Sequence, residues 1–170
     1  INFISDSWLT GTATANMLNA PGHLRTLGNM SFNYAGTVDD LELLGNGNIT
    51  LTGDLNIANT LTLTSVNIIS GGALRVSGTV VTNDVNGWTA TPPASASFLS
   101  LTGSTDQTIS GPGLLYLLDV NKPAGNVLMP DNLDLQAGGK LTGTGFFDNT
   151  GGVFNTIGNA TFDFSGTIED

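Results

Sequence analysis

The feature that most constrains the fold is a series of short runs in which apolar and polar residues alternate. Such runs occur at 49–52, 60–64 and 161–164, and the second of them reads Thr-Leu-Thr-Leu-Thr. Alternation with a period of two places the apolar side chains on one face of a β-strand and the polar ones on the other. Stretches with apolar residues at i, i+3, i+4 and i+7, which are typical of helices, are almost absent. The sequence therefore predicts an all-β fold.

The second clue is how these runs end. Many of them close with an apolar residue, then Ser or Thr, then Gly, and Gly permits the sharp corner that a strand needs in order to turn. The glycines of this pattern are Gly11, Gly53, Gly71, Gly78, Gly103, Gly111, Gly143 and Gly166. Short strands with many corners favour a β-solenoid, similar to a right-handed parallel β-helix. A β-sandwich is the alternative, because it also uses short alternating strands. Scarce two-residue hairpin signals favour the solenoid over the sandwich.

The alternating runs also predict the core. Their apolar positions should stack in the interior of successive coils, each contributing about 1.5–3 kcal/mol when fully buried. The predicted core residues are Leu51, Leu55, Ile57, Leu61, Leu63, Val66, Ile68, Leu74 and Val76.

The longest interruption of the pattern runs from 83 to 97 and contains Trp88 and two adjacent prolines. A loop of this length in a compact domain is usually functional or marks a boundary. We therefore expect residues 1–170 to form one all-β unit, with two lobes divided by the 83–97 loop as one interpretation and a plain surface excursion as the other. Trp88 is a candidate ligand contact, since an exposed Trp can stack on a sugar ring, although burial at a coil end is the alternative.

The two ends of the sequence resemble each other. Residues 28–40 align without gaps over 158–170, and nearly every difference is conservative, so that 1–40 and 131–170 are interpreted as diverged copies of one repeat segment. An open solenoid end exposes unpaired backbone groups that invite strand addition. The alignment predicts that the strands 31–34 and 161–164 occupy equivalent positions and form an assembly edge. The side chains assigned to this edge are Phe32, Tyr34, Phe162 and Phe164.

Composition excludes some partners. The chain carries four Lys and Arg residues against fourteen Asp and Glu residues, which gives a net charge of −10. Binding of nucleic acid requires clustered Lys and Arg, and these residues are scattered singly here. No segment approaches the roughly 20 consecutive apolar residues of a membrane span. We therefore expect neither nucleic-acid binding nor membrane insertion, and the scarcity of Lys with abundant Thr, Asn and Gly suggests an extracellular location.

A family resemblance points the same way. The segments 106–111, 114–127 and 132–135 resemble the strand-rich repeats of giant secreted surface proteins of the Bacteroidetes and their relatives, which include adhesins and gliding-associated filaments. The resemblance covers roughly 98–170 and, more weakly, the rest of the chain. It implies a secreted, surface-attached and non-catalytic role, and it carries over no binding residues.

The candidate chemistry is sparse. The chain has no Cys and a single His, which leaves His23 as the only side chain around which a nucleophilic triad could form. We therefore predict that the protein is not an enzyme and has no cofactor, with calcium as the one open possibility. Acidic residues occupy matching places in the two copies and could share a cation through hard oxygen ligands, although a solvated acidic turn is the simpler interpretation. These residues are Asp39, Asp40, Glu169 and Asp170.

Two functions remain open from the sequence. The first is an extracellular structural or adhesive repeat unit that joins copies of itself, or adjacent repeats, head-to-tail into a fibre or array on the cell surface. The second is a surface module that binds glycans or another ligand through Trp88 and the 83–97 loop.

Overall fold

The protein is a β-solenoid in the computed structural model, which describes residues 2–4, 7–14, 23–44, 48–64, 68–83, 98–149 and 151–169. No helix occurs among these residues. Its strands are β1 (Asn2–Ile4), β2 (Ser7–Thr14), β3 (His23–Leu27), β4 (Met30–Leu44), β5 (Asn48–Leu51), β6 (Leu55–Thr64), β7 (Ile68–Gly71), β8 (Leu74–Val76), β9 (Thr79–Thr82), β10 (Leu99–Leu101), β11 (Gln107–Ser110), β12 (Gly113–Asn121), β13 (Val127–Leu128), β14 (Leu133–Thr144), β15 (Phe146–Asp148), β16 (Phe154–Thr156), β17 (Thr161–Phe164) and β18 (Thr167–Ile168).

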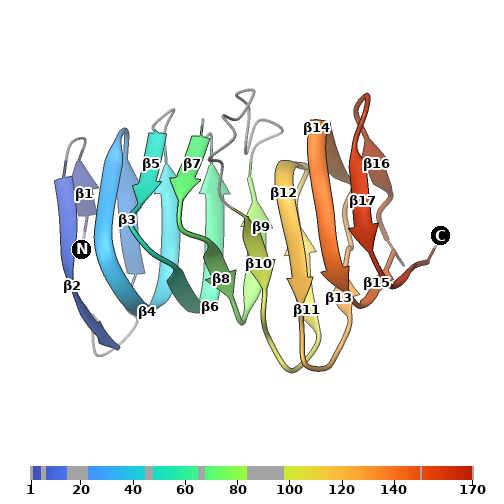
Figure 1. Cartoon of the computed structure of the whole chain (residues 1–170), viewed down its shortest axis with the longest axis horizontal. Coiled ribbons are helices and arrows are strands. Elements are labelled where there is room, and N and C mark those ends of the chain that lie inside the picture. The colour runs from blue at the N-terminus through green and yellow to red at the C-terminus, as the bar shows by residue number, and fades with distance from the viewer. Residues whose placement is uncertain are drawn as a thin grey trace.

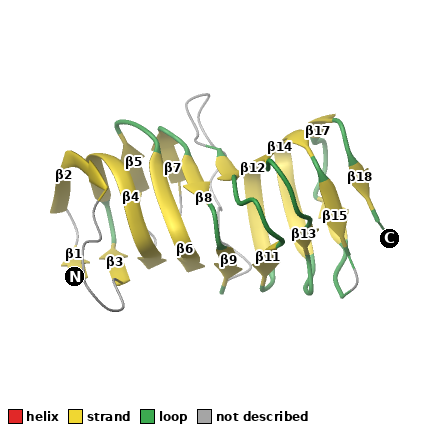
Figure 2. Cartoon of the chain, turned by 90° about the horizontal axis from the view of Figure 1, so that it is seen from below, coloured by secondary structure: helices red, strands yellow, loops and turns green. Residues whose placement is uncertain are grey.

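Every strand pairing in the described part of the chain is parallel. Each strand pairs with strands one coil before or after it, and hydrogen-bonded partners on neighbouring coils lie 19 to 21 residues apart in the sequence at several corners. The coils stack along one axis, with β1 and β2 at one end and β16 to β18 at the other (Figures 1 and 2). This arrangement confirms the solenoid and rules out the antiparallel sandwich.

The interior consists of columns of apolar side chains that run along this axis. One column passes through Leu55, Leu74, Leu99, Leu118 and Leu141, each of them fully buried. The predicted core residues Leu51, Leu55, Ile57, Leu61, Leu63, Leu74 and Val76 are all buried. The side chains of Val66 and Ile68 lie outside the described part of the structure. Alternation along β8 and along the two halves of β6, 55–57 and 61–63, explains this agreement, because each strand turns one face inward.

The glycine pattern has two physical causes. Gly71, Gly111 and Gly143 have positive φ values and form the predicted corners. Gly78 and Gly103 do not have a positive φ, but a Cβ atom at either position would overlap backbone atoms of the preceding coil. Glycine is therefore required at those two positions by close stacking of the coils, whereas the sequence interpretation assigned all of them to turning.

The 83–97 segment does not interrupt the ladder. β8 pairs with β10 and β9 pairs with β11, so strands on either side of the segment lie directly against each other. Residues 84–97, including Trp88, lie outside the described residues. The interpretation that this segment divides two lobes stays a prediction.

One polar cluster interrupts the apolar interior beside these strands. Gln107 occupies the column that continues through Val127 and Phe147, and its side chain is only 1% exposed. Its Nε2 donates to the carbonyls of Val76 (2.9 Å) and Gly78 (2.8 Å). Its Oε1 accepts from the N–H of Gly103 (2.7 Å) and from Lys122 Nζ (2.8 Å).

Lys122 completes this cluster. Its ammonium group also donates to the carbonyls of Gly103 (3.0 Å) and Thr105 (2.7 Å). Burial lowers the pKa of Lys122, and the neighbouring Asp106 carboxylate acts in the opposite direction. The cluster joins three coils, because its members come from the segments around β8, β11 and β12.

Candidate functional site

Three of the four exposed large hydrophobic side chains in the described part of the structure lie at the C-terminal end of the solenoid. Phe162 continues the leucine column beyond Leu141, with which it is in register. The five leucines before it in this column are each 0% exposed, whereas Phe162 is 50% exposed. Its position in the ladder is an interior position. It is exposed because no further coil covers it in this structure.

Four phenylalanine rings build this end. Phe147 is fully buried. The centroid of its ring lies 5.7 Å from that of Phe154 and 5.6 Å from that of Phe164. Phe162 packs edge-on against Phe154 at 6.3 Å. These tilted and edge-to-face contacts are the arrangements that aromatic pairs prefer. The cluster therefore has a packed inner layer and a partly exposed outer layer.

The same end exposes two further apolar side chains and has an open backbone edge. Val153 and Ile157 are 52% and 48% exposed, and Phe164 and Ile168 are partly buried against the core. In the described structure, β16 and β17 pair only with β14, and β18 pairs only with β15. β16 and β17 lie at the far end of the ladder in Figure 1, and β18 lies at the same end in Figure 2. We refer to the exposed residues Val153, Ile157 and Phe162, with the outer sides of β16 to β18, as the end face.

The residues predicted for an assembly edge separate into two groups. Phe164 and Phe162 lie at the end face, but Phe32 is fully buried inside the solenoid, where β4 is covered by β5 through the pair Phe32–Leu51. The side chain of Tyr34 lies outside the described part of the structure. Only the C-terminal pair of phenylalanines therefore lies at an end of the ladder.

The expected equivalence of the strands 31–34 and 161–164 is wrong. The column of Phe162 passes back through the leucines to Leu55 and then to Gly36, four residues beyond Phe32. Sequence alignment without gaps cannot detect this shift, because coil lengths differ and the ladder contains irregularities at 38–40 and 115–117. The sequence similarity of 1–40 and 131–170 is unaffected, and its interpretation as a repeat stays a prediction.

The acidic residues proposed for calcium lie in separate parts of the molecule. Asp39 and Asp40 belong to β4, and Asp40 Oδ1 accepts a hydrogen bond from the N–H of Thr60 at 3.0 Å. Glu169 follows β18, which lies at the opposite end (Figure 2), and Asp170 lies outside the described residues. Within the described ranges, no group of three or more His, Asp or Glu side chains is placed to hold a metal ion. A cation shared between neighbouring units stays a prediction.

The comparisons with known proteins gave no similarity to report. No protein-family model, no curated protein and no solved structure matches the chain. Among the described residues there is also no helix that is long and apolar enough to cross a membrane.

Proposed function

We propose that this chain is an extracellular structural unit that stacks head-to-tail, with the end face of one unit covered by the first coil of a neighbouring unit of the same kind. The neighbour is another copy or an adjacent repeat. The product is a longer solenoid, which would serve as a fibre or array at the cell surface.

The single observation that carries this proposal is the exposure of Phe162. A Phe side chain that is half exposed presents roughly 75–125 Å² of apolar surface, since aromatic residues bury about 150–250 Å² in full. At about 25 cal/mol per Å², covering it is worth roughly 2–3 kcal/mol. Val153 and Ile157 add further apolar surface on the same face. A coil stacked on this end would cover Phe162, which continues the interior column.

The unpaired backbone groups at this end also favour a neighbouring coil as the partner. In a parallel ladder, N–H and C=O groups point along the axis, so that a terminal strand presents unpaired groups to whatever lies beyond it. A neighbouring coil with strands of the same spacing would pair with β16 to β18 through main-chain hydrogen bonds, and apolar columns would set the register. A globular partner of another shape would cover the phenylalanines but leave these groups unpaired.

Location and role rest on composition and resemblance. The net charge of −10 favours solubility of an exposed array, and the strand-rich style of 98–170 resembles repeats of secreted surface proteins. The absence of clustered catalytic side chains in the sequence agrees with a structural role, in which no chemistry is performed.

The test is to place a charge on the end face and follow assembly by light scattering over a range of protein concentrations. The wild-type chain should form larger species as concentration rises, and Phe162→Asp should abolish this growth. Leu27→Asp is the matched control, because Leu27 is similarly exposed (43%) but belongs to β3, which pairs on both sides with β1 and β4.

The control variant should assemble as the wild type does. Negative-stain electron microscopy of the wild type should show linear particles that are absent for Phe162→Asp. Assembly that persists unchanged in Phe162→Asp, or a wild-type chain that remains monomeric at every concentration, would contradict the proposal.

A further inference from the structure

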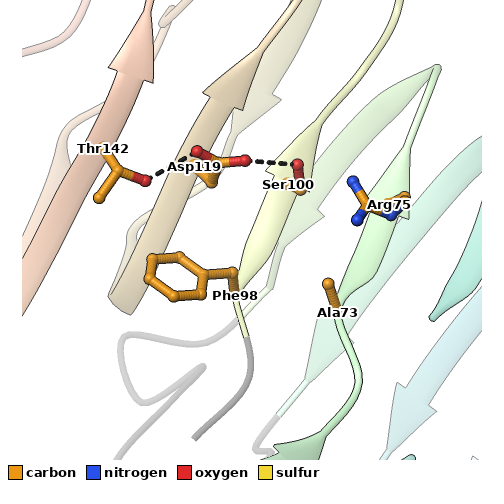
Figure 3. Close-up of a pocket in the computed structure, with 6 residues that line it drawn as sticks. All are labelled: Ala73, Arg75, Phe98, Ser100, Asp119 and Thr142. Carbon is orange, nitrogen blue, oxygen red and sulfur yellow. Dashed lines mark hydrogen bonds between the residues drawn. The ribbon is translucent and has the colours of Figure 1, made fainter. Parts of the chain in front are cut away.

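A polar row on the flank of the solenoid forms a second candidate site. Arg75 of β8, Ser100 of β10, Asp119 of β12 and Thr142 of β14 occupy equivalent outward positions on four successive coils. With Ala73 and Phe98 they line a pocket of about 260 Å³ (Figure 3). This volume is slightly below the range typical of drug-sized ligands, and it suits a small group such as one sugar ring.

Asp119 is held in a fixed orientation inside this pocket. Its Oδ2 accepts a hydrogen bond from Ser100 Oγ at 2.8 Å, and its Oδ1 accepts one from Thr142 Oγ1 at 2.7 Å. Ser100 is only 1% exposed, so one of the two supporting hydroxyls is buried. A carboxylate has about four acceptor positions. Two therefore remain for a ligand after the two hydroxyls are bound.

Arg75 is oriented in a similar way at the other side of the pocket. Its Nε and Nη2 each lie 2.7 Å from Asp54 Oδ2, which fixes the plane of the guanidinium group. A guanidinium has five N–H donors, and these two contacts do not use all of them. The pocket thus combines a preoriented acceptor with a preoriented donor.

Phe98 supplies the apolar wall. Figure 3 shows its ring beside the Asp119 carboxylate, on the side of the pocket away from Arg75. An apolar ring next to paired donors and acceptors matches the surface of a pyranose, which has an apolar face and hydroxyl groups that both donate and accept. A free anion would meet the carboxylates of Asp119 and Asp54, and a simple cation would meet Arg75.

We propose that this pocket binds one neutral sugar ring of a glycan, with the apolar face of the ring on Phe98 and its hydroxyls on Asp119 and Arg75. The site lies on the flank, whereas the proposed stacking uses the end of the solenoid. Glycan binding and assembly are therefore compatible, and each can be tested without the other. Trp88 has no part in this inference.

The test uses saturation-transfer NMR and isothermal titration calorimetry with soluble oligosaccharides of glucose, galactose, mannose and N-acetylglucosamine, and with choline chloride as a cationic probe. At least one neutral oligosaccharide should bind the wild type. Asp119→Asn should weaken that binding about 10- to 100-fold, because a hydrogen bond to a charged group is being weakened or lost. Phe98→Ala should weaken it as well, through loss of the apolar wall.

Asp134→Asn is the matched control. Asp134 is a half-buried, outward-facing carboxylate of β14 that bonds Asn155 Nδ2 at 2.9 Å, and it lies outside the pocket. This variant should bind the oligosaccharide as the wild type does, and circular dichroism should show all three variants folded. Failure of every neutral oligosaccharide to bind, binding of choline alone, or binding that Asp119→Asn and Phe98→Ala leave unchanged would overturn the proposal.

Discussion

Replacing Gln107 by leucine separates two accounts of the interior. Gln107 occupies a column whose other members include Val127 and Phe147, so the pattern of the column suggests that an apolar residue belongs there. On that account Gln107→Leu should stabilise the protein by about 1.5–3 kcal/mol, the value of burying one more apolar side chain. The hydrogen bonds of Gln107 lead to the opposite expectation.

The structure allows the cost to be counted. Gln107→Leu removes the acceptor of the Gly103 N–H and the donor to the Gly78 carbonyl. The Val76 carbonyl keeps its bond from the N–H of Thr102 at 2.8 Å. The buried N–H of Gly103 and the partly buried carbonyl of Gly78 therefore each lose a partner, at about 1–3 kcal/mol each, and Lys122 loses one of three acceptors. After the gain from the leucine is subtracted, the midpoints of these ranges leave a net destabilisation of about 2 kcal/mol.

The assay combines urea unfolding, followed by circular dichroism, with native-state hydrogen exchange. Gln136→Leu is the matched control, because the buried Oε1 of Gln136 has no hydrogen-bond partner. Gln136→Leu should leave stability unchanged or raise it, whereas Gln107→Leu should lower the urea midpoint and accelerate exchange of the Gly103 amide. Exchange reports local opening even where a solenoid does not unfold in a single step. A Gln107→Leu variant at least as stable as the wild type would refute the reasoning.

Two further predictions concern the glycines at the corners and the stability of the protein at low pH. Gly71→Ala should cost clearly more than Gly138→Ala when urea midpoints are compared. Both glycines have a positive φ, which costs about 1–2 kcal/mol for a residue with a Cβ. Only at Gly71 would the added Cβ overlap a backbone carbonyl of the preceding coil. At Gly138 the atom nearest to the added Cβ is 3.5 Å away. Equal midpoints would contradict this. The N–H of Ala73, more than the nearby Arg75, lowers the pKa of Asp54 from its ordinary value of 3.8. The ionised Asp54 thus contributes stability above about pH 4 that is lost as pH falls through the lowered pKa. Asp54→Asn should show a smaller acid-induced loss in urea unfolding at a series of pH values, and parallel pH profiles of the two proteins would count against this.

The sequence was sufficient for the fold because its main signal is local. Alternation within a strand decides which side chains turn inward, and this held for every predicted core residue whose side chain the structure describes, from Leu51 to Val76. The same alternation, with a period of two, also indicated strands and not helices. The choice between solenoid and sandwich depended on weaker signals, namely many glycine corners and few hairpin turns, and the parallel pairing of every described strand decides it.

The sequence was insufficient for register between coils. Which residue stacks on which depends on the length of each intervening coil and on irregularities such as the one at Leu115 and Leu117. The aligned phenylalanines Phe32 and Phe162 therefore fall in different columns, although their local sequences are similar. The flank pocket was missed for the same reason, since Arg75 and Asp119 belong to different coils and meet only through the ladder. No short-range pattern contains that information.

Some of the acidic residues have a structural role at the corners between strands. At five corners the side-chain oxygen of an Asp or Asn accepts a hydrogen bond from a backbone N–H of the following coil, at 2.8–3.0 Å. The acceptors are Asn29, Asp40, Asp54, Asp106 and Asn132. Corners are the places where strand pairing lapses, so their N–H groups need another partner. A carboxylate or amide oxygen fills that need, and at Asp54 the same carboxylate also binds Arg75.

This role accounts for part of the charge of −10 that composition alone assigns to solvation. It also gives Asp40 a function independent of calcium, because its Oδ1 already binds the N–H of Thr60. These five bonds run from the backbone of a later coil to the side chain of an earlier one, whereas the N–H of Gly111 donates in the opposite sense, to Asp131 Oδ2 of the following coil at 2.8 Å. A coil stacked on the end face would therefore bring corner N–H groups of its own, and side-chain acceptors at the corners of the terminal coil would be the groups to receive them. Stacking of like coils thus extends a bonding pattern that the solenoid already uses at five of its corners.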